Sequence, residues 1–285
     1  MVVYASNDIV SDHIKGDTHQ WESQETKEMM VALRSPVPAS PRDSKHPARW
    51  VKKEAPLVVD VGANIGWFTL KAAEAGARVA AFEAMASNIQ LVRTSLCANP
   101  GLMDRVALYN TGLGTQRATC SIISDVSNMG DGHTICDKDT KDVIKQWKSE
   151  FGRDYVVRGE MRVRRLDSLI EEDVQFMKID VEGFEAEVLK GAAQLLDNHN
   201  VWFIAAACNH NKLKEAGKAE YLKFLNDQGY YISTQGFQGP FINIDDIEAG
   251  RPSSLPSHSL YCVKKLLIDA AGGPNKRRPS DVAKS

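Results

Sequence analysis

The chain has 285 residues, of which 43% are hydrophobic, and a formal net charge of −2. This length suits one large domain with added termini, and the near-neutral charge gives no sign of a general nucleic-acid binder. Residues 1–8 have neither the basic nor the apolar part of a leader peptide, and no apolar run reaches membrane-spanning length. We therefore expect a cytoplasmic protein.

The cysteines are scattered along the chain and form no C-x-x-C pair: Cys97, Cys120, Cys136, Cys208 and Cys262. An odd, scattered set of this kind fits reduced thiols in an intracellular protein. We predict that each packs as a small hydrophobic side chain.

Residues 1–54 are predicted to form a helical extension and a linker. Acidic and apolar residues between positions 7 and 34 suit one or two short helices. Residues 35–54 are rich in proline and basic side chains and lack apolar periodicity, which is typical of a connection. His13 or Trp21 could meet a substrate, although a surface histidine and a packed tryptophan are the simpler interpretations.

The clearest pattern begins at Pro56, where a β-branched run passes through Asp60 into a loop that contains Gly62 and Gly66. Glycine accepts backbone angles and close contacts that a Cβ would forbid, so a ligand can lie against such a loop. Helix-favouring residues follow as far as Gly76, a typical C-terminal stop. The segment predicts a strand, a ligand-binding loop and a helix.

A second strand, residues 78–83, ends in Glu83. Two strands joined by one helix form a parallel, right-handed crossover, and ligands of such sheets bind beyond the carboxyl ends of the strands. An acid about 20 residues after the first glycine commonly binds ribose hydroxyls. We predict this role for Glu83.

The nature of the ligand follows from the loop sequence. The G-x-G-x-x-G spacing of dinucleotide sites is absent, and Asp60 precedes the loop. A carboxylate there would repel a pyrophosphate but suits an ammonium group. S-adenosylmethionine (SAM) carries an ammonium group, a ribose diol and a sulfonium, so the sequence favours SAM. A nucleotide-dependent oxidoreductase is the alternative that this spacing opposes.

Two further strands are predicted at residues 105–110 and 174–180, and the second of these ends in Asp180, with Glu182 close behind. A carboxylate at the carboxyl end of such a strand points into the crevice that already holds Asp60 and Glu83. Four acids in one crevice favour cationic SAM over its neutral product, S-adenosylhomocysteine (SAH).

The pattern weakens between residues 120 and 157, which we interpret as an insertion at the top of the sheet, where specificity usually resides. A hairpin around Gly159 is expected after it. His133 lies near Cys136 and Asp137, but no second closely spaced ligand pair accompanies them. We therefore predict no metal site.

The last predicted elements are strands at residues 201–208, 230–233 and 259–263 and a helix between the first two. His210 directly follows the strand at 201–208. The basic tail beyond residue 268 has the composition of a disordered segment.

Several of these blocks, in this order, resemble the FkbM-type class I methyltransferases, which use SAM. The resemblance covers roughly residues 55–235 and rests on these blocks: Val59-Asp60-Val61-Gly62-Ala63-Asn64-Ile65-Gly66, Phe82-Glu83 with Asn88, Arg165-Leu166-Asp167-Ser168-Leu169, Met177-Lys178-Ile179-Asp180-Val181-Glu182-Gly183-Phe184-Glu185 and Val188-Leu189-Lys190-Gly191-Ala192. The Asp-Val-Glu-Gly block with its following helix is the part that points to FkbM.

This resemblance implies a Rossmann-like α/β fold, with a doubly wound seven-stranded sheet in which residues 259–263 form the one antiparallel strand. The methyltransferase domain would span residues 55–268, with a helical extension at 1–54 and a disordered tail at 269–285. The implied cofactor-binding residues are Asp60, Gly62, Asn64, Gly66, Glu83, Asn110 and Asp180.

The resemblance further implies O-methylation of a hydroxyl on a sugar or secondary metabolite, and the near-neutral charge predicts no nucleic-acid partner. The candidates for the base that takes the hydroxyl proton are Asp180, Glu182 and His210. The family commonly has a glutamate where this chain has Ala205-Ala206-Ala207. A SAM-binding protein with impaired catalysis is therefore the alternative.

Overall fold

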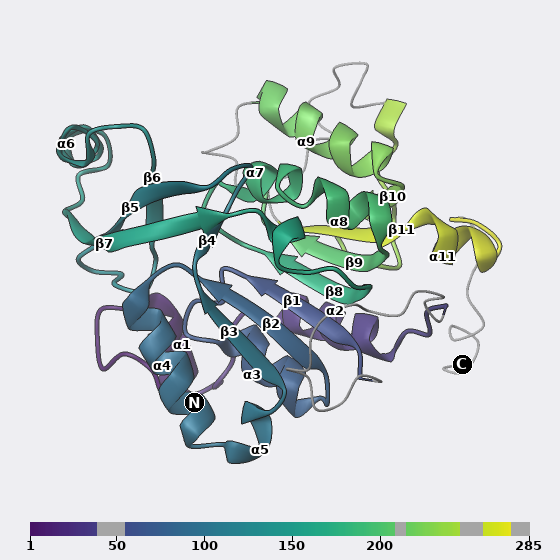
Figure 1. Ribbon diagram of the computed structural model, residues 1–285, viewed down its shortest axis with the longest axis horizontal. Helices are drawn as coiled ribbons and strands as arrows, with labels where there is room; N and C mark the ends of the chain where they lie inside the picture. The colour runs from purple at the N-terminus through teal and green to yellow at the C-terminus, as the bar shows by residue number, and fades with distance from the viewer. Residues whose placement is uncertain (39–54, 209–214, 246–258, 275–285) are drawn as a thin grey trace.

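The computed structural model describes residues 1–38, 55–208, 215–245 and 259–274. Seven strands form the main sheet (Figure 1), in the order β10 (Tyr230–Ser233), β11 (Leu260–Lys264), β9 (Val201–Ala206), β8 (Val174–Ile179), β1 (Leu57–Val61), β2 (Arg78–Glu83) and β3 (Val106–Asn110). Strand β11 is antiparallel to both of its neighbours, whereas β1 pairs in parallel with β2 and β8. The predicted class I methyltransferase fold is confirmed.

Both faces of this sheet are covered, which explains why its central strands have almost continuous apolar sequences. One face packs against α7 (Glu185–Lys190), α8 (Ala193–Asn198) and α9 (Glu215–Asp227), and the other against α2 (Ser23–Arg34), α3 (Trp67–Glu74) and α11 (Lys265–Ala270). The short η1 (Leu166–Ser168) precedes β8, and α4 (Ala86–Cys97) and α5 (Pro100–Met103) connect β2 to β3. Among the described helices, none is both long enough and apolar enough to cross a membrane.

The N-terminal segment consists of α1 (Ile9–Lys15) and α2, in agreement with the one or two helices expected there. Helix α2 buries Met29 and Ala32 fully in the same core as α3. The Gln175 amide of β8 also donates a hydrogen bond of 2.8 Å to the Ala32 carbonyl. The segment is therefore packed directly onto the sheet. Residues 39–54 of the predicted linker and 275–285 of the predicted tail lie outside the described residues.

The insertion forms a second sheet, in the order β4 (Gly112–Leu113), β7 (Tyr155–Arg164), β5 (Ala118–Asp125) and β6 (His133–Ile135), followed in sequence after β6 by α6 (Thr140–Phe151). Figure 1 shows it beside one end of the main sheet. The hairpin expected around Gly159 is wrong, because β7 is one continuous strand paired with β5. Gly159 lies opposite Ile122, where the register shifts, so this glycine occupies a bulge and not a turn.

The prediction of five reduced cysteines is also wrong. Cys120 and Cys136 form a disulfide, with their Cα atoms 4.6 Å apart. The adjacent residues Ser121 and Ile135 pair directly in the antiparallel ladder of β5 and β6, so the two cysteines face each other across the strands. This pairing depends on a strand register that the sequence spacing does not reveal. Of the free cysteines, Cys97 is exposed, which also differs from the prediction.

Candidate active site

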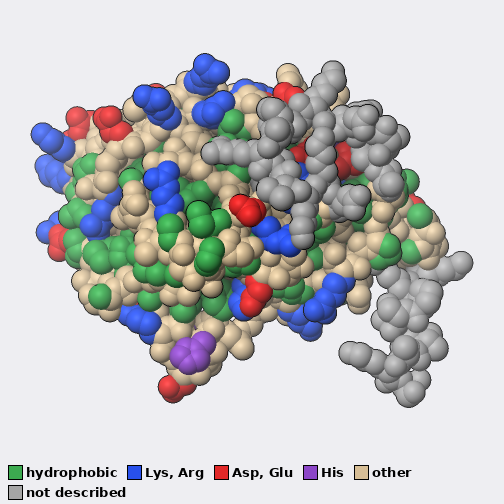
Figure 2. All heavy atoms as spheres, turned by 60° about the horizontal axis from the view of Figure 1, so that its bottom comes forward, with side chains coloured by type: hydrophobic (Ala, Val, Ile, Leu, Met, Phe, Trp, Pro, Cys, Tyr) green, Lys and Arg blue, Asp and Glu red, His purple; other side chains and the backbone are tan. Residues whose placement is uncertain are grey.

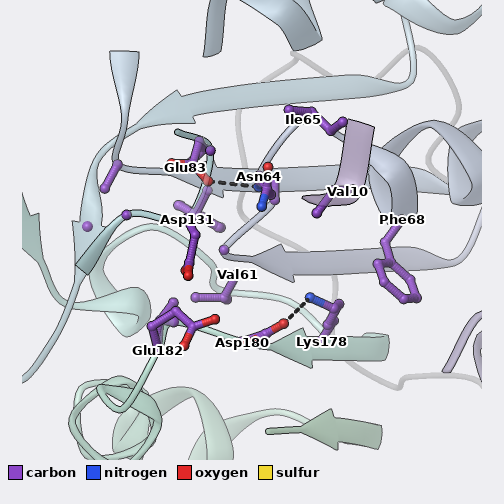
Figure 3. Close-up of a pocket in the computed structure, with 18 of the residues that line it drawn as sticks. Val10, Val61, Asn64, Ile65, Phe68, Glu83, Asp131, Lys178, Asp180 and Glu182 are labelled. Carbon is purple, nitrogen blue, oxygen red and sulfur yellow. Dashed lines mark hydrogen bonds and ion pairs between the residues drawn. The ribbon is translucent and has the colours of Figure 1, made fainter. Parts of the chain in front are cut away.

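A cavity of about 220 Å³ lies at the carboxyl ends of β1, β2 and β8 (Figure 3). We divide most of its lining into two parts: a sheet side (residues 61–65, 82–84, 178, 180–182 and 184) and a cover side (residues 9–10, 21–22, 128, 130–132 and 134). The ionisable residues among the described lining are five acids and one lysine: Glu22, Glu83, Asp131, Asp180, Glu182 and Lys178. Such a lining favours a cationic ligand.

The glycine loop on the sheet side is shaped by the strand beside it. Gly62 has a φ of +80°, and a Cβ at this position would lie 1.8 Å from the carbonyl oxygen of Asp180. The backbone N–H groups of Gly62 and Ala63 donate to the Phe82 carbonyl at 2.9 and 3.0 Å. Gly62 thus lets the ends of three strands meet. We expected a ligand to lie close to this glycine, but the group that lies close to it is the backbone carbonyl of Asp180.

Glu83 ends β2 and faces the loop, as predicted. Its carboxylate accepts hydrogen bonds from the backbone N–H groups of Asn64 at 2.8 Å and Met85 at 2.7 Å. Burial nevertheless raises the pKa of Glu83 to about 7, because the loss of water outweighs these two bonds. Glu83 can therefore ionise near neutral pH when a ligand donates a hydrogen bond to its carboxylate.

Asn64 provides an unsatisfied acceptor beside Glu83. Its backbone has a left-handed φ of 50°, and its Oδ1 atom is buried without a hydrogen-bond partner. Buried polar atoms are normally paired, so an orphaned oxygen on a cavity wall fits a ligand with hydroxyl or ammonium donors. This fits SAM, which carries both kinds of donor.

Asp60 and Asn110 lie outside the described cavity lining. Asp60 is fully buried below the loop, where its Oδ2 accepts a bond of 2.6 Å from the Thr69 hydroxyl. Burial raises the pKa of Asp60, in spite of Lys178 and Thr69. The Asn110 amide donates to the carbonyl oxygens of Glu83 and Ala84, at 3.1 and 2.9 Å. Direct contacts of Asp60 and Asn110 with a cofactor stay predictions.

Asp180 follows β8 and forms an ion pair with Lys178, whose Nζ lies 3.2 Å from its Oδ2 (Figure 3). Lys178 is 7% exposed, and its Nζ also lies 4.8 Å from the centre of the Phe68 ring. Burial alone would lower the pKa of Lys178, but Asp180, Glu22 and Asp60 together raise it. Lys178 therefore stays protonated near neutral pH and cannot serve as a base there.

Glu22 is a cavity residue that sequence reasoning missed. It precedes α2 in a left-handed conformation, with a φ of 42°. The pKa of Glu22 is raised to about 7, chiefly by burial and also by the nearby Asp180 and Glu25, against the opposite effect of Lys178. A carboxyl with such a pKa can accept a proton near neutral pH. No motif marks Glu22, because only the packing of the N-terminal segment brings it to the sheet.

Glu182 and Asp131 face each other across the cavity (Figure 3). With His133, they offer one ligand atom each, and these three atoms lie within 4.8 Å of one another. Glu182 was predicted from the sequence, whereas the interpretation of His133 paired it with Cys136 and Asp137. The disulfide removes Cys136 from that set. His210, the third predicted base, lies outside the described residues.

The seven-stranded sheet with its one antiparallel strand is the fold of the class I methyltransferases. Residues 60–232, more than half of the chain, match the family Methyltransferase FkbM domain. The chain therefore belongs to the FkbM methyltransferase family, as its sequence blocks predicted.

Solved structures with similar folds include other methyltransferases. Methyltransferase FkbM from Methylobacillus flagellatus KT is 19% identical with a TM-score of 0.44, over 73% of this chain and 43% of that one. An rRNA methylase from Streptococcus thermophilus is 14% identical (TM-score 0.38; 74% and 87% covered). Magnesium protoporphyrin IX methyltransferase from Synechocystis PCC 6803, solved with bound SAM, is 12% identical (TM-score 0.39; 74% and 70% covered). This chain thus spans less than half of the FkbM structure. None of the curated proteins matches it.

Proposed function

We propose that this methyltransferase acts on a hydroxyl group of a sugar or secondary metabolite. The observation that supports a hydroxyl acceptor is the set of carboxylates that line the cavity, two of which, Glu22 and Glu83, have a pKa of about 7. A hydroxyl is a weak nucleophile and gains from a base that takes its proton as the new bond forms. An amine that is already unprotonated gains less from such a base.

Glu83 and Asn64 are the residues that we propose for cofactor binding at the cavity wall. Glu83 would accept hydrogen bonds from ribose hydroxyls, and Asn64 Oδ1 would gain the partner that it lacks. When bound, SAM supplies an electrophilic methyl group on a sulfonium. The protein then has to align the acceptor oxygen and exclude water. Asp60, Gly62, Gly66, Asn110 and Asp180 stay predicted cofactor residues.

The proton of the acceptor hydroxyl needs a carboxylate on the cavity wall. Glu22 is our preferred base, because its pKa of about 7 lets it take a proton and release it again near neutral pH. Asp180 forms an ion pair with Lys178, and Glu182 lies close to a second carboxylate, that of Asp131. Glu22 would take the hydroxyl proton as the acceptor oxygen receives the methyl group that bound SAM would supply.

A SAM-binding protein without turnover is the second candidate, and the alanine run in β9 favours it. Ala205 and Ala206 are 4% and 1% exposed, so neither leaves room for the acid that the family commonly has near this point. Ala207 follows β9, and its N–H donates to the Ile179 carbonyl at 2.8 Å. Ala207→Glu is thus the substitution that would restore an acid with least disturbance of the core.

Calorimetric titration with SAM and SAH tests the cofactor assignment. We expect binding by the parent chain, and weaker binding by Glu83→Ala and Asp60→Ala. Absence of binding by the parent chain would contradict the proposal. A labelled-methyl assay should then cover hydroxylated sugars and metabolites, with an rRNA fragment as the nucleic-acid arm. Cofactor binding with no transfer to any acceptor would favour the second candidate.

A small-molecule or glycan acceptor also agrees with the charges of the chain. The net charge is −2, and on the face seen in Figure 2 the Lys and Arg side chains are separated by hydrophobic and uncharged groups, with acids between them. A protein that binds nucleic acid would gain from a continuous basic surface. The cytoplasmic location stays a prediction, against which the disulfide of Cys120 and Cys136 weighs, because disulfides are rare in that compartment.

A further inference from the structure

Two carboxylates that line the cavity, those of Asp131 and Glu182, lie close to the imidazole of His133. We propose that these three residues bind a divalent transition-metal ion, which in turn holds the acceptor hydroxyl. The binding of the ion concerns this chain alone, whereas its action on the acceptor rests on the function proposed above.

The separations of the three side chains suit a common ion. His133 Nε2 lies 3.6 Å from Asp131 Oδ2, and all three ligand atoms lie within 4.8 Å of one another. Around an ion with bonds of about 2.1 Å, adjacent ligands of an octahedron are about 3.0 Å apart and opposite ones about 4.2 Å. The existing distances approach these values, so small rotations of the two carboxylates would complete the site.

Neighbouring side chains contact Asp131 and His133 and restrict their orientation. The Asn128 amide donates a bond of 3.2 Å to Asp131 Oδ2. The His133 ring, at the start of β6, makes edge contacts with Trp147 and Tyr155, whose centres are 5.3 and 5.9 Å away. A hydrogen bond such as that from Asn128 orients a metal ligand and raises the affinity of a site, and the ring contacts restrict the orientation of His133.

The third ligand is held by its own turn. Glu182 has a left-handed φ of 55°. The buried carboxylate of Glu185 accepts hydrogen bonds of 3.1 Å from the N–H groups of Val181 and Gly183, on either side of Glu182. Glu182 is thereby directed into the cavity toward Asp131 (Figure 3).

The surrounding charges also call for a cation. Asp131 and Glu182 share the cavity with three further acids. In the described lining, the one cationic side chain is Lys178, which is paired with Asp180. Carboxylates brought together in a partly buried site repel one another, and a divalent ion offsets that repulsion.

The donor set indicates the class of ion and of acceptor. Two carboxylate oxygens and one imidazole nitrogen suit Mn²⁺, Fe²⁺ or Zn²⁺, and three protein ligands leave positions open toward the cavity. A hydroxyl bound to such an ion loses its proton more easily, which adds to the effect of a base such as Glu22. Adjacent open positions suit the vicinal hydroxyls of a sugar. Glu182 would then act as a metal ligand and not as a base.

Titration with Mn²⁺ alone tests the site. The chain is freed of any affinity tag, stripped with a chelator and titrated by calorimetry and by electron paramagnetic resonance. We expect one ion per chain, and at least about tenfold weaker binding in Asp131→Asn and in Glu182→Gln. Asp137→Asn is the matched control, because Asp137 is an exposed acid in the segment after β6, outside the trio. The affinity of the Asp137→Asn variant for Mn²⁺ should differ from that of the parent chain by less than about twofold.

A spectroscopic measurement separates the site from adventitious binding. Pulsed paramagnetic resonance of the Mn²⁺ complex should show coupling to an imidazole nitrogen, and His133→Gln should abolish it while the thermal unfolding of the chain remains cooperative. Failure of both Mn²⁺ and Zn²⁺ to bind would overturn the proposal. Binding that is undiminished in Asp131→Asn and Glu182→Gln would also overturn it.

The same preparations distinguish this proposal from the methyltransferase function. SAH binding is measured on the stripped chain, so binding of SAH without binding of Mn²⁺ would overturn the metal site alone. In the acceptor screen, transfer to sugar diols should rise at least about tenfold when Mn²⁺ is added. Transfer that is independent of the ion would overturn its role toward the acceptor.

Discussion

The sheet side and the cover side of the cavity are built in different ways. On the sheet side, Glu83 is the last residue of β2, and Gly62 and Asp180 directly follow β1 and β8, so the strand ladder brings them together. On the cover side, Glu22 and Asp131 come from segments far apart in the sequence. The difference suggests that cofactor binding is a property of the sheet, whereas acceptor chemistry depends on how the cover packs.

On the cover side, hydrogen bonds join the N-terminal segment to the loop at residues 128–130. The N–H of Gly130 donates to the Asp8 carboxylate at 3.1 Å, and the N–H of Met129 donates to the Asn7 carbonyl at 2.7 Å. The Asn128 side chain accepts a bond of 3.1 Å from the N–H of Ile9. Asn128 also supports Asp131. The N-terminal segment therefore positions the loop that carries two of the proposed metal ligands.

Substitution of one glycine on each side should give the largest effect and test this contrast. We expect Gly62→Ala to lower the free energy of unfolding by about 3 kcal/mol or more, because the new Cβ meets the backbone of Asp180 and the φ is left-handed. In Gly130→Ala, the new Cβ would lie 2.3 Å from the Asp8 carboxylate. That side chain can rotate away, but α1 then loses its N-cap. We expect a cost of about 1 to 2 kcal/mol there. Urea unfolding measures both, and equal losses would contradict the contrast.

Loss of the disulfide should weaken the cover side while the sheet side keeps its function. Cys120→Ser should lower the free energy of unfolding by about 3 kcal/mol. This is the value expected for a disulfide between cysteines that are 16 residues apart in the sequence. SAH affinity should change little, since Glu83 and Asn64 lie on the sheet side. Cys97→Ser, at an exposed free cysteine, is the control. Labelling of the unfolded parent chain without reductant should find three thiols, and five would refute the disulfide.

The sequence predicts the main sheet well because the patterns that mark its strands lie in residues that are close together in the sequence. An apolar run that ends in Asp60 and a glycine loop predicts β1 and α3, and the acid at position 83 follows from the crossover. The fold and family that the resemblance of the sequence blocks implied are confirmed.

The remaining site residues depend on packing over long distances. Glu22 reaches the cavity because Met29 and Ala32 of α2 enter the core, and nothing near position 22 in the sequence encodes that contact. The approach of His133 to Glu182 likewise requires the register of β5 and β6 and the turn after β8. A pattern of neighbouring residues instead pointed to Cys136, which forms the disulfide.

The pH dependence of cofactor binding examines the sheet side by itself. Glu83 carries a proton in the folded chain up to about pH 7, and a ribose contact favours its ionised form. Affinity for SAH should therefore rise as the pH increases through about 7. We expect Glu83→Gln to bind at least about tenfold more weakly at pH 8, with a shallower dependence on pH. Calorimetry at pH 6, 7 and 8 measures this, and an unchanged slope in the variant would assign the titration to another group.

The smallest effect concerns Glu22 on the cover side, and its sign is distinctive. The folded-state pKa of about 7 lies above the ordinary value of 4.5, so the folded chain holds this proton more tightly than the unfolded chain does. The resulting stability is complete below pH 4.5 and is lost as the pH rises to about 7.

Glu22→Gln should therefore be more stable than the parent chain at pH 8, by about 1 kcal/mol after allowance for partial contact with water, and nearly equal to it at pH 4.5. Urea unfolding at both pH values gives the difference, with Glu150→Gln on the exposed surface of α6 as the control. A difference that does not vary with pH would mean that Glu22 does not titrate near neutrality. The proton of the acceptor would then need another base, and the contrast between a cofactor-binding sheet side and a catalytic cover side would rest on the metal site alone.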